Sequence, residues 1–266
     1  PDLNLLNESA RSKCRHGGPH VGVDIGERLG GPLRALPRLL LDALKNPALY
    51  APVDISRDHL DQTAHRLRRD YPGLAIEPVC ADYMMLEALP AIVPGTPRLG
   101  FFPGSTIGNL EPHEARSFLR RARRLLADKG AMVLGVDLRK DPLRLHAAYN
   151  DEAGVTASFT LNLLRRMNRE LGATFDPSQF AHDASYNSVE GRIEIYFRSL
   201  RRQSVMVAGH SFAFGEGERV HTEYSYKYDI ASLASLASDG GFVLSEVWTD
   251  PGKLFAVAFL EANPNG

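Results

Sequence analysis

One strand–turn–helix–strand unit decides the fold. Residues 98–138 read RLGFFPGSTIGNLEPHEARSFLRRARRLLADKGAMVLGVDL. The apolar run Arg98–Phe102 predicts a strand that leads into a turn, residues 103–109. An amphipathic helix should follow, because apolar residues recur on one of its faces: Phe118, Leu119, Ala122, Leu125 and Leu126. Residues 131–138 (AMVLGVDL) are continuously apolar in character, which is typical of a parallel strand buried on both faces.

The chain before this unit repeats the same alternation of elements. A short helix is expected from Arg38 to Leu44, ended by Asn46-Pro47. The elements predicted next are a strand over 50–55, a helix from Ser56 to about Arg69, a strand over 74–80 and a short helical stretch to Leu89. An apolar stretch around residues 21–25 could form one more strand. Strands that alternate with helices indicate a parallel α/β sheet with right-handed crossovers.

The pattern changes after Lys140. Four apolar residues at helical spacing predict one long helix over 151–170: Val155, Phe159, Leu163 and Met167. A β-hairpin over 181–200 is expected to turn at Glu190-Gly191, and a further β stretch covers 204–214. After Tyr228 we expect a helix to about Ala237 and two antiparallel strands, 242–249 and 254–261. The predicted architecture is a parallel sheet completed by one antiparallel C-terminal strand, with a β-containing insert before it.

Composition excludes several classes of protein. The 266 residues include 31 Lys and Arg against 32 Asp and Glu, which gives a net charge of −1. That balance argues against binding to nucleic acid or anionic lipid, because both need a clear basic excess. Cys14 and Cys80 cannot build a disulfide framework, and no apolar run approaches the roughly 20 residues that span a bilayer. We therefore expect a soluble, cytoplasmic monomer without nucleic-acid or membrane partners.

Polar residues follow three of the predicted parallel strands. Ligands of such a sheet bind at the carboxyl ends of its strands, near the switch point in strand order. Asp54 could accept hydrogen bonds from two ribose hydroxyls and Asp82 could bind an adenine amine, although either acid could instead cap a helix. Residues 104–109 (GSTIGN) place two glycines, a Ser-Thr pair and Asn109 within six residues, just before a helix; Gly104 is the first of these glycines. The glycines there would let a ligand approach the backbone, but ordinary turns use the same residue types.

A second polar cluster, TEYSYK, covers residues 222–227. In a strand, Glu223 and Ser225 would share one face, because side chains alternate. A carboxylate beside a hydroxyl suits a ligand with N–H donors, and the alternative is a solvated strand face. The lone histidines His146 and His182 are expected to be surface or hydrogen-bonded residues.

Other catalytic chemistries lack their sequence signatures. The chain has no H-E-x-x-H, no G-x-S-x-G and no G-x-x-x-x-G-K-[ST]. These absences argue against a zinc hydrolase, a nucleophile-elbow hydrolase and a P-loop nucleotidase. We predict no metal site.

Six segments together resemble one known family. They are FFPGSTIGNLEPHEA (101–115), GVDLRKDPLRLHAAYND (135–151), NRELGATFDPSQFAH (168–182), RIEIYF (192–197), TEYSYKY (222–228) and WTDP (248–251). The family is that of the histidine-specific, S-adenosylmethionine-dependent methyltransferases, which make N-α-trimethylhistidine, the precursor of ergothioneine. The resemblance runs from about Leu39 to the C-terminus. A fungal member acts on a prenylated tryptophan, so another aromatic amino acid such as tryptophan is the alternative substrate.

The resemblance also implies two domains and a role for each predicted site residue. Residues 1–139 and 228–266 would form a Rossmann-like class I methyltransferase domain, with residues 140–227 as an α+β substrate-binding insert. Four positions would contact the cofactor S-adenosylmethionine: Asp54 at the ribose, Asp82 and Tyr83 at the adenine, and Gly104, which also lies against the substrate amine. Asn109 and Tyr149 would grip the amine and carboxylate of the amino acid. Glu223 and Ser225 would hydrogen-bond its imidazole.

The start of the chain departs from the family pattern. The family opens with a strand and a glycine-rich loop roughly 20 residues ahead of the ribose acid. Here RLGGPL (28–33) supplies Gly30 and Gly31 at that distance, without the family's acid-Leu-Gly-x-Gly order; Val23-Asp-Ile-Gly26 is an earlier alternative. No counterpart of the family's tyrosine-bearing N-terminal segment precedes Pro37. A cofactor-binding-impaired, non-catalytic remnant of the family is therefore the rival hypothesis.

Overall fold

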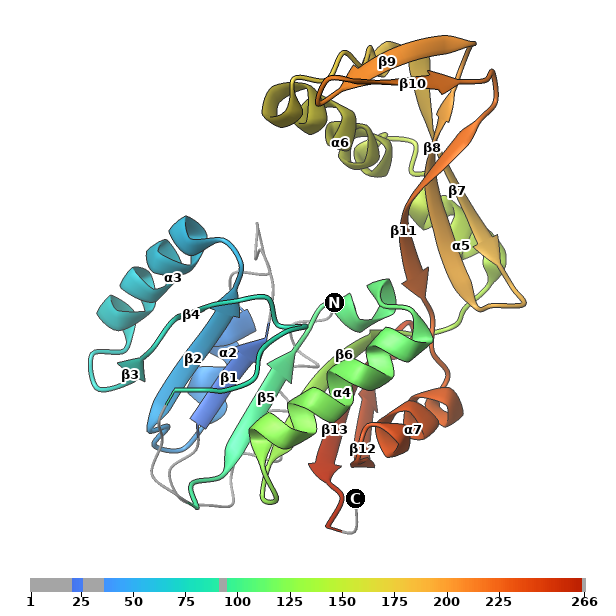
Figure 1. Ribbon diagram of the computed structural model, residues 1–266. Coiled ribbons are helices and arrows are strands. Elements are labelled where there is room, and N and C mark those ends of the chain that lie inside the picture. The colour runs from blue at the N-terminus through green and yellow to red at the C-terminus, as the bar shows by residue number, and fades with distance from the viewer. Residues whose placement is uncertain (1–20, 26–35, 91–94, 265–266) are drawn as a thin grey trace. The chain divides into compact units, whose positions relative to one another are not determined.

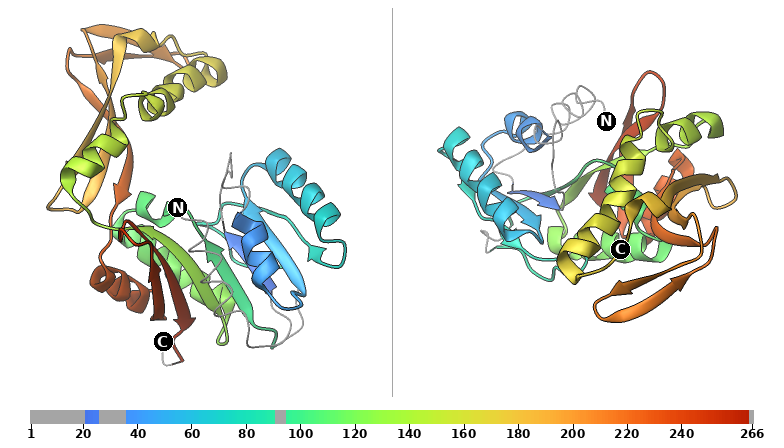
Figure 2. Two further views of the ribbon diagram at one scale, coloured as in Figure 1. Left: turned by 180° about the vertical axis from the view of Figure 1, so that it is seen from behind. Right: turned by 90° about the horizontal axis from the view of Figure 1, so that it is seen from above.

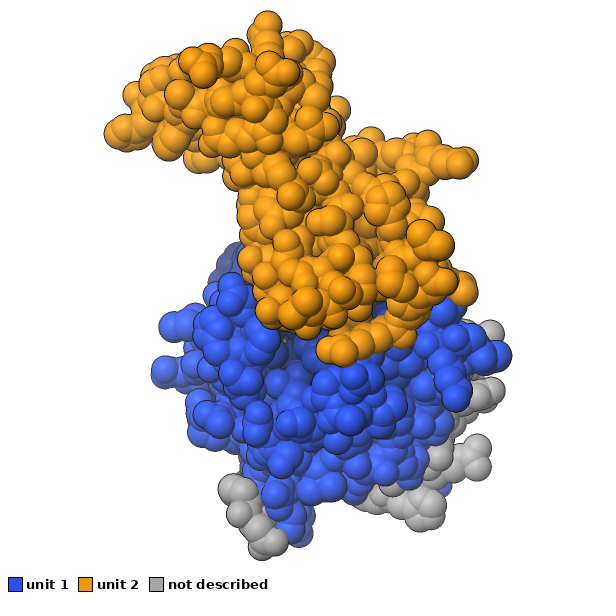
Figure 3. All heavy atoms as spheres, turned by 90° about the vertical axis from the view of Figure 1, so that its right-hand side faces the viewer, with its two compact units in different colours: residues 1–138, 228–266 blue, residues 139–227 orange. Residues whose placement is uncertain are grey.

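A computed structural model describes residues 21–25, 36–90 and 95–264 of the chain (Figures 1 and 2). The chain divides into two compact units. Unit 1 comprises residues 1–138 and 228–266, and unit 2 comprises residues 139–227 (Figure 3). Each unit is described by itself.

Unit 1 contains an eight-stranded sheet in the described part of the chain, with the order β12-β13-β6-β5-β1-β2-β3, while β4 also pairs with β2. Its strands are β1 (Val21–Ile25), β2 (Leu49–Asp54), β3 (Ala75–Ile76), β4 (Val79–Cys80), β5 (Arg98–Phe102), β6 (Ala131–Asp137), β12 (Phe242–Thr249) and β13 (Phe255–Ala262). The pairs β1–β2, β1–β5 and β5–β6 are parallel, and β13 runs antiparallel to β6. The predicted class, a parallel sheet with one antiparallel C-terminal strand, is confirmed.

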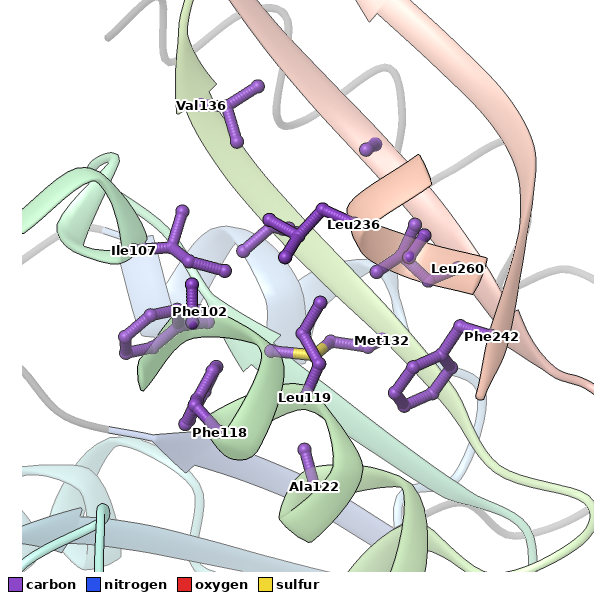
Figure 4. Close-up of a cluster of buried hydrophobic side chains, with 14 of the residues drawn as sticks. Phe102, Ile107, Phe118, Leu119, Ala122, Met132, Val136, Leu236, Phe242 and Leu260 are labelled. Atoms are coloured by element: carbon purple, nitrogen blue, oxygen red, sulfur yellow. The ribbon is translucent and has the colours of Figure 1, made fainter. Parts of the chain in front are cut away.

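Helices cover both faces of this sheet. Side chains of α2 (Leu36–Ala43) and α3 (Arg57–Asp70) belong to one buried cluster, and those of α4 (Pro112–Leu126) and α7 (Ile230–Asp239) to another (Figure 4). Strand β6 contributes to both clusters, Val133 to the first and Met132 and Leu134 to the second. Alternate side chains of β6 therefore enter different cores, which explains why its sequence is apolar throughout.

A capping box fixes the start of α4. Glu111 is the N-cap, Pro112 occupies the first turn, and the backbone N–H of Glu111 donates to the Glu114 carboxylate at 2.8 Å. This capping box satisfies backbone groups that the first turn of a helix leaves unpaired. It also fixes the end of the preceding loop, residues 103–109.

Two predictions for unit 1 were wrong. The strand expected over 74–80 is two short strands, β3 and β4, on either side of Glu77-Pro78. Proline lacks the N–H that a continuous ladder needs, which accounts for the break. The helical stretch expected to Leu89 is a turn, because the Asp82 carboxylate accepts from the Met84 N–H at 2.8 Å and so replaces a helical hydrogen bond.

The two positions where the chain leaves and rejoins unit 1 lie side by side. Leu138 and Tyr228 form a parallel β-bridge, and the Tyr228 N–H donates to the Asp137 carbonyl at 3.0 Å. The Leu138 N–H donates to the Leu254 carbonyl at 3.0 Å. The sheet therefore continues past the insertion point.

Unit 2 is an α+β unit. Its helices are α5 (Pro142–Tyr149) and α6 (Val155–Leu171), with a short 3₁₀ turn η3 (Pro177–Gln179). Its strands are β7 (Phe180–Asn187), β8 (Arg192–Ser199), β9 (Gln203–Val207), β10 (His210–Phe214) and β11 (Arg219–Tyr226). They form a three-stranded sheet, β11-β8-β7, and a two-stranded sheet, β10-β9. The predicted hairpin is confirmed, and its turn places Gly191 at a φ of 68°, a backbone conformation that favours glycine.

The helical part of unit 2 differs from the prediction of one helix over 151–170. The Asp151 carboxylate accepts from the N–H groups of Val155 and Thr156, at 2.8 and 2.9 Å, and α6 begins there. These bonds lower the pKa of Asp151 to about 2. A separate helix, α5, precedes it and was not predicted. The apolar stripe that predicted the helix is also not its buried face, because Phe159 is 72% exposed whereas Thr160 and Leu164 are buried.

Replacing Gly130 with alanine should destabilise unit 1. A Cβ at Gly130 would meet the carbonyl oxygen and Cβ of Leu126 well inside van der Waals contact, so the end of α4 would have to move. We expect the free energy of unfolding, measured by urea denaturation, to fall by about 1–3 kcal/mol. Gly73→Ala is the control, since nothing lies within 4 Å of its added Cβ. Equal effects of the two substitutions would contradict the packing argument.

Candidate functional site

Unit 1 gathers polar residues at the carboxyl edge of its parallel strands. Strand β1 lies between β2 and β5, so the chain builds the sheet in one direction through β2 and then in the other through β5 and β6. This reversal is the switch point at which open α/β sheets bind ligands. Asp54 ends β2, Asp82 follows β4, and Gly104 follows β5. Three of the predicted cofactor residues thus share this edge.

Asp54 is the most buried polar residue of this edge, with 7% of its surface exposed. Its Oδ1 accepts from the Ser56 backbone N–H at 2.6 Å, immediately before α3. The capping role considered for Asp54 is therefore present in part. The hydrogen bond uses one carboxylate oxygen, so the other oxygen can accept from a ligand hydroxyl.

Asp82 and Tyr83 have different surroundings. Asp82 is exposed and accepts the Met84 N–H described above. The ring of Tyr83 is half-buried and packs edge-on against Phe102 and Phe118, at centroid distances of 5.5 and 5.7 Å. The Tyr83 ring is thus part of the core of unit 1, and the adenine contact stays a prediction for both residues.

The loop after β5 has an unusual backbone. Gly104 and the non-glycine Ser105 both have positive φ, 78° and 62°. The Ser105 hydroxyl accepts the Asp137 backbone N–H at 2.8 Å and so ties the loop to the end of β6. Thr106–Asn109 form a 3₁₀ turn, η2, in which Ile107 is buried and Asn109 is exposed. Positive φ at a non-glycine residue costs of order 1–3 kcal/mol and is common at functional loops.

Two predicted cofactor residues, Gly30 and Gly31, lie outside the described residues. They belong to the segment between β1 and α2. Strand β1 covers Val21–Ile25 and so includes residues 23–25 of the alternative Val23-Asp-Ile-Gly26; both positions of the family's strand-end acid stay predictions. The segment that follows the central strand is where this class of fold has its glycine-rich loop.

Unit 2 brings Tyr149 and Ser225 together with a residue that was not predicted. The Tyr149 hydroxyl lies 2.9 Å from the Ser225 hydroxyl, and the Lys227 Nζ donates to both, at 2.8 and 2.7 Å. Lys227 is only 3% exposed and Ser225 7%. Tyr149 comes from the end of α5 and the other two residues from the end of β11 or directly after it.

Glu223 lies on the same face as Ser225, because the two residues pair with Ile195 and Ile193 of β8 in one regular ladder. The predicted shared face is thereby confirmed, and the solvated-face alternative is wrong, since this face packs with Leu145, Ala184, Ile193 and Ile195. Burial raises the pKa of the Glu223 carboxyl, and the positive charge of Lys227 opposes that rise. We name Glu223, Ser225, Lys227 and Tyr149 the Glu223 cluster.

His182 fixes the end of α5. Its Nε2 lies 2.7 Å from the Tyr149 carbonyl and its Nδ1 lies 3.0 Å from the Thr160 hydroxyl. The prediction of a hydrogen-bonded histidine is confirmed for His182. Among the described residues, no group of three or more His, Cys, Asp or Glu could hold a metal ion. Within the same residues, no helix is long and apolar enough to cross a bilayer.

Comparisons with known proteins agree on one family. The sequence profile described as "Histidine-specific methyltransferase, SAM-dependent" matches residues 31–262. The histidine N-alpha-methyltransferase of Mycolicibacterium smegmatis is 37% identical over 90% of this chain and 75% of its own length. That of Mycobacterium tuberculosis is 37% identical over 96% and 78%. Ergothioneine biosynthesis protein 1 of Neurospora crassa is 29% identical over 86% of this chain and 26% of its own.

A solved structure supports the fold. The CcbJ methyltransferase of Streptomyces caelestis superposes with a TM-score of 0.51 and covers 98% of this chain and 96% of its own. At 15% sequence identity this likeness concerns the fold alone. Sheet order and topology are thus those of class I methyltransferases.

Proposed function

Because this chain belongs to the family of histidine-specific, S-adenosylmethionine-dependent methyltransferases, we propose that it methylates the α-amine of L-histidine. The product would be N-α-trimethylhistidine, on the way to ergothioneine. The single observation that carries the choice of histidine is the Glu223 cluster, which holds a carboxylate and a hydroxyl on one buried strand face. An imidazole has the N–H donor that such a carboxylate needs.

The residues of unit 1 suit the cofactor. We propose that the second carboxylate oxygen of Asp54 binds the ribose hydroxyls and that Asp82 and Tyr83 contact the adenine. The backbone of Gly104 would contact the cofactor. Gly30 and Gly31 would contribute to the preceding loop. When bound, S-adenosylmethionine supplies a methyl group that a neutral amine can attack without a metal ion.

Asn109 and Tyr149 are proposed to hold the amine and carboxylate of the amino acid. The attacking amine must be unprotonated, since an ammonium has no lone pair. An amide such as Asn109 can accept or donate without a charge, whereas a carboxylate at that position would raise the pKa of the ammonium and oppose the reaction. Positioning by such contacts can supply several kcal/mol of rate acceleration.

We further infer that the chain works as a monomer in the cytoplasm, with a small molecule as its partner. The absence of a basic excess supports the small-molecule partner, because nucleic acid and anionic lipid bind to basic surfaces. Sedimentation velocity on the purified protein tests the oligomeric state, and a dimer at micromolar concentration would contradict it.

Isothermal titration calorimetry tests the proposal most directly. Histidine titrated into the protein with S-adenosylhomocysteine should give saturable heat, and tryptophan under the same conditions should give little. Mass spectrometry with S-adenosylmethionine should then detect methylated histidine. Heat with tryptophan but not with histidine would favour tryptophan as the substrate. No heat on titration of S-adenosylmethionine would favour the hypothesis of a non-catalytic remnant.

A further inference from the structure

The contacts of Lys227 form a closed triangle. Its Nζ lies 2.8 Å from the Tyr149 hydroxyl and 2.7 Å from the Ser225 hydroxyl, and the two hydroxyls lie 2.9 Å apart. The ammonium also lies 4.8 Å from the centroid of the Tyr149 ring. Because the side chain is 3% exposed, these contacts are made largely away from water. An ammonium is costly to bury, so its retention here needs an explanation.

The chemistry of the ammonium fixes the direction of the hydrogen bonds. A lysine ammonium has three donors and no acceptor, so both hydroxyl oxygens must accept from Lys227. Each hydroxyl keeps its own proton, and only one of these two protons is used between the hydroxyls. The remaining proton must be donated to a further acceptor. Tyr149 and Ser225 together are thereby a donor toward a ligand.

The same charge acts on the carboxylate. Glu223 lies two residues before Ser225 on one strand face, and the charge of Lys227 opposes the rise in the Glu223 pKa that burial causes. The phenols of Tyr149 and Tyr186 also pack against this cluster of buried side chains. The charge of Lys227 therefore favours the ionised form of Glu223, in which both carboxylate oxygens accept.

We propose that Lys227 is a positioning residue that sets the hydrogen-bond polarity of the Glu223 cluster, with Glu223 as acceptor and the Ser225–Tyr149 pair of hydroxyls as one donor. The Cα atoms of residues two apart on a strand lie about 6.6 Å apart, so a carboxylate and a hydroxyl at such positions can bind two atoms of one five-membered ring. A neutral imidazole has one N–H and one bare nitrogen and satisfies both. An indole has an N–H and no acceptor, so it would leave the donor unpaired.

The inference rests on the proposed function for its substrate, and Lys227→Met tests it in the full chain. Methionine has a similar shape and no charge. We expect the KM for histidine to rise about tenfold or more, while kcat and the KM for S-adenosylmethionine change by less than about threefold. Lys129→Met is the matched control, because Lys129 is exposed and belongs to unit 1. A histidine KM within about twofold of the wild-type value overturns the inference.

A double-mutant cycle separates positioning from a structural role. If Lys227 acts through Tyr149, then Lys227→Met combined with Tyr149→Phe should be little worse than the worse single variant. Effects that multiply would overturn the inference. Lys227→Met removes two hydrogen bonds and the charge that acts on Glu223, so its melting temperature is measured together with its KM. A lower melting temperature with an unchanged KM would show a structural role and overturn the inference.

A final measurement does not depend on turnover. The Glu223 carboxyl can be followed by ¹³C NMR during a pH titration of the wild-type protein and of Lys227→Met. The inference requires a higher titration midpoint in the variant, and an unchanged midpoint overturns it. A raised midpoint in a protein that fails to methylate histidine would support the role of Lys227 and overturn only the proposed function.

Discussion

Replacing Glu223 with alanine is expected to lower kcat/KM for histidine by about a hundredfold and to narrow the preference for histidine over tryptophan. The substrate would lose a charge-assisted hydrogen bond and leave its N–H unpaired on a largely buried face, and each of these costs about 1–3 kcal/mol. Competition between histidine and tryptophan for limiting enzyme, with products quantified by mass spectrometry, measures the change.

The control for Glu223 is Glu190→Ala. Glu190 is an exposed glutamate of the same unit, at the turn between β7 and β8, so its removal should leave kcat/KM unchanged. Glu223→Gln provides a second comparison, because its amide oxygen still accepts but carries no charge. Unchanged selectivity in Glu223→Ala would refute the role at the imidazole.

Replacing Asp54 with alanine is expected to weaken S-adenosylmethionine binding by more than about a hundredfold. Two hydrogen bonds from ribose hydroxyls to one carboxylate would be lost, and bonds to charged groups contribute about 1.5–3 kcal/mol each. Calorimetric titration of S-adenosylhomocysteine measures the loss in the absence of turnover.

Asp54 also holds the Ser56 N–H, so its variants must separate two effects. Asp54→Asn keeps an oxygen for that N–H and should preserve the melting temperature, yet still bind the cofactor weakly. Asp61→Asn, at an exposed position of α3, should change neither property. Full cofactor affinity in a folded Asp54→Ala protein would rule out the ribose contact.

Local signals were sufficient where one side-chain pattern dictates one structure. The strand Arg98–Phe102 is confirmed to the residue, and β6 ends one residue before the predicted Leu138. Both are apolar runs between clear turn residues. The helix α5 was missed although Asp141-Pro142 is a good helix start, with the Asp141 carboxylate accepting the Leu143 N–H at 2.7 Å. Its eight residues carry only a weak apolar pattern, so periodicity does not predict a helix there.

Other features depend on tertiary contacts that a sequence does not contain. Periodicity predicted α6 but not its start at Val155 or its buried face. Phe159 and Leu164 are both apolar, and only packing distinguishes them. Lys227 follows Glu223 and Ser225 at the same two-residue spacing, and this spacing is the sequence signal that could have placed it in the cluster. The role of Lys227 depends on its hydrogen bond to Tyr149, which is 78 residues away in sequence. A lysine next to a polar strand is ordinarily solvated, and its burial was not predictable.

The bridge between Leu138 and Tyr228 decides how the segment between them can be replaced. Because Leu138 and Tyr228 are paired in the sheet of unit 1, the segment 139–227 can be exchanged as a whole without changing how any strand of that sheet is paired. Replacing that segment therefore leaves the pairing of the eight strands, and the strand-end residues Asp54, Asp82 and Gly104, in place.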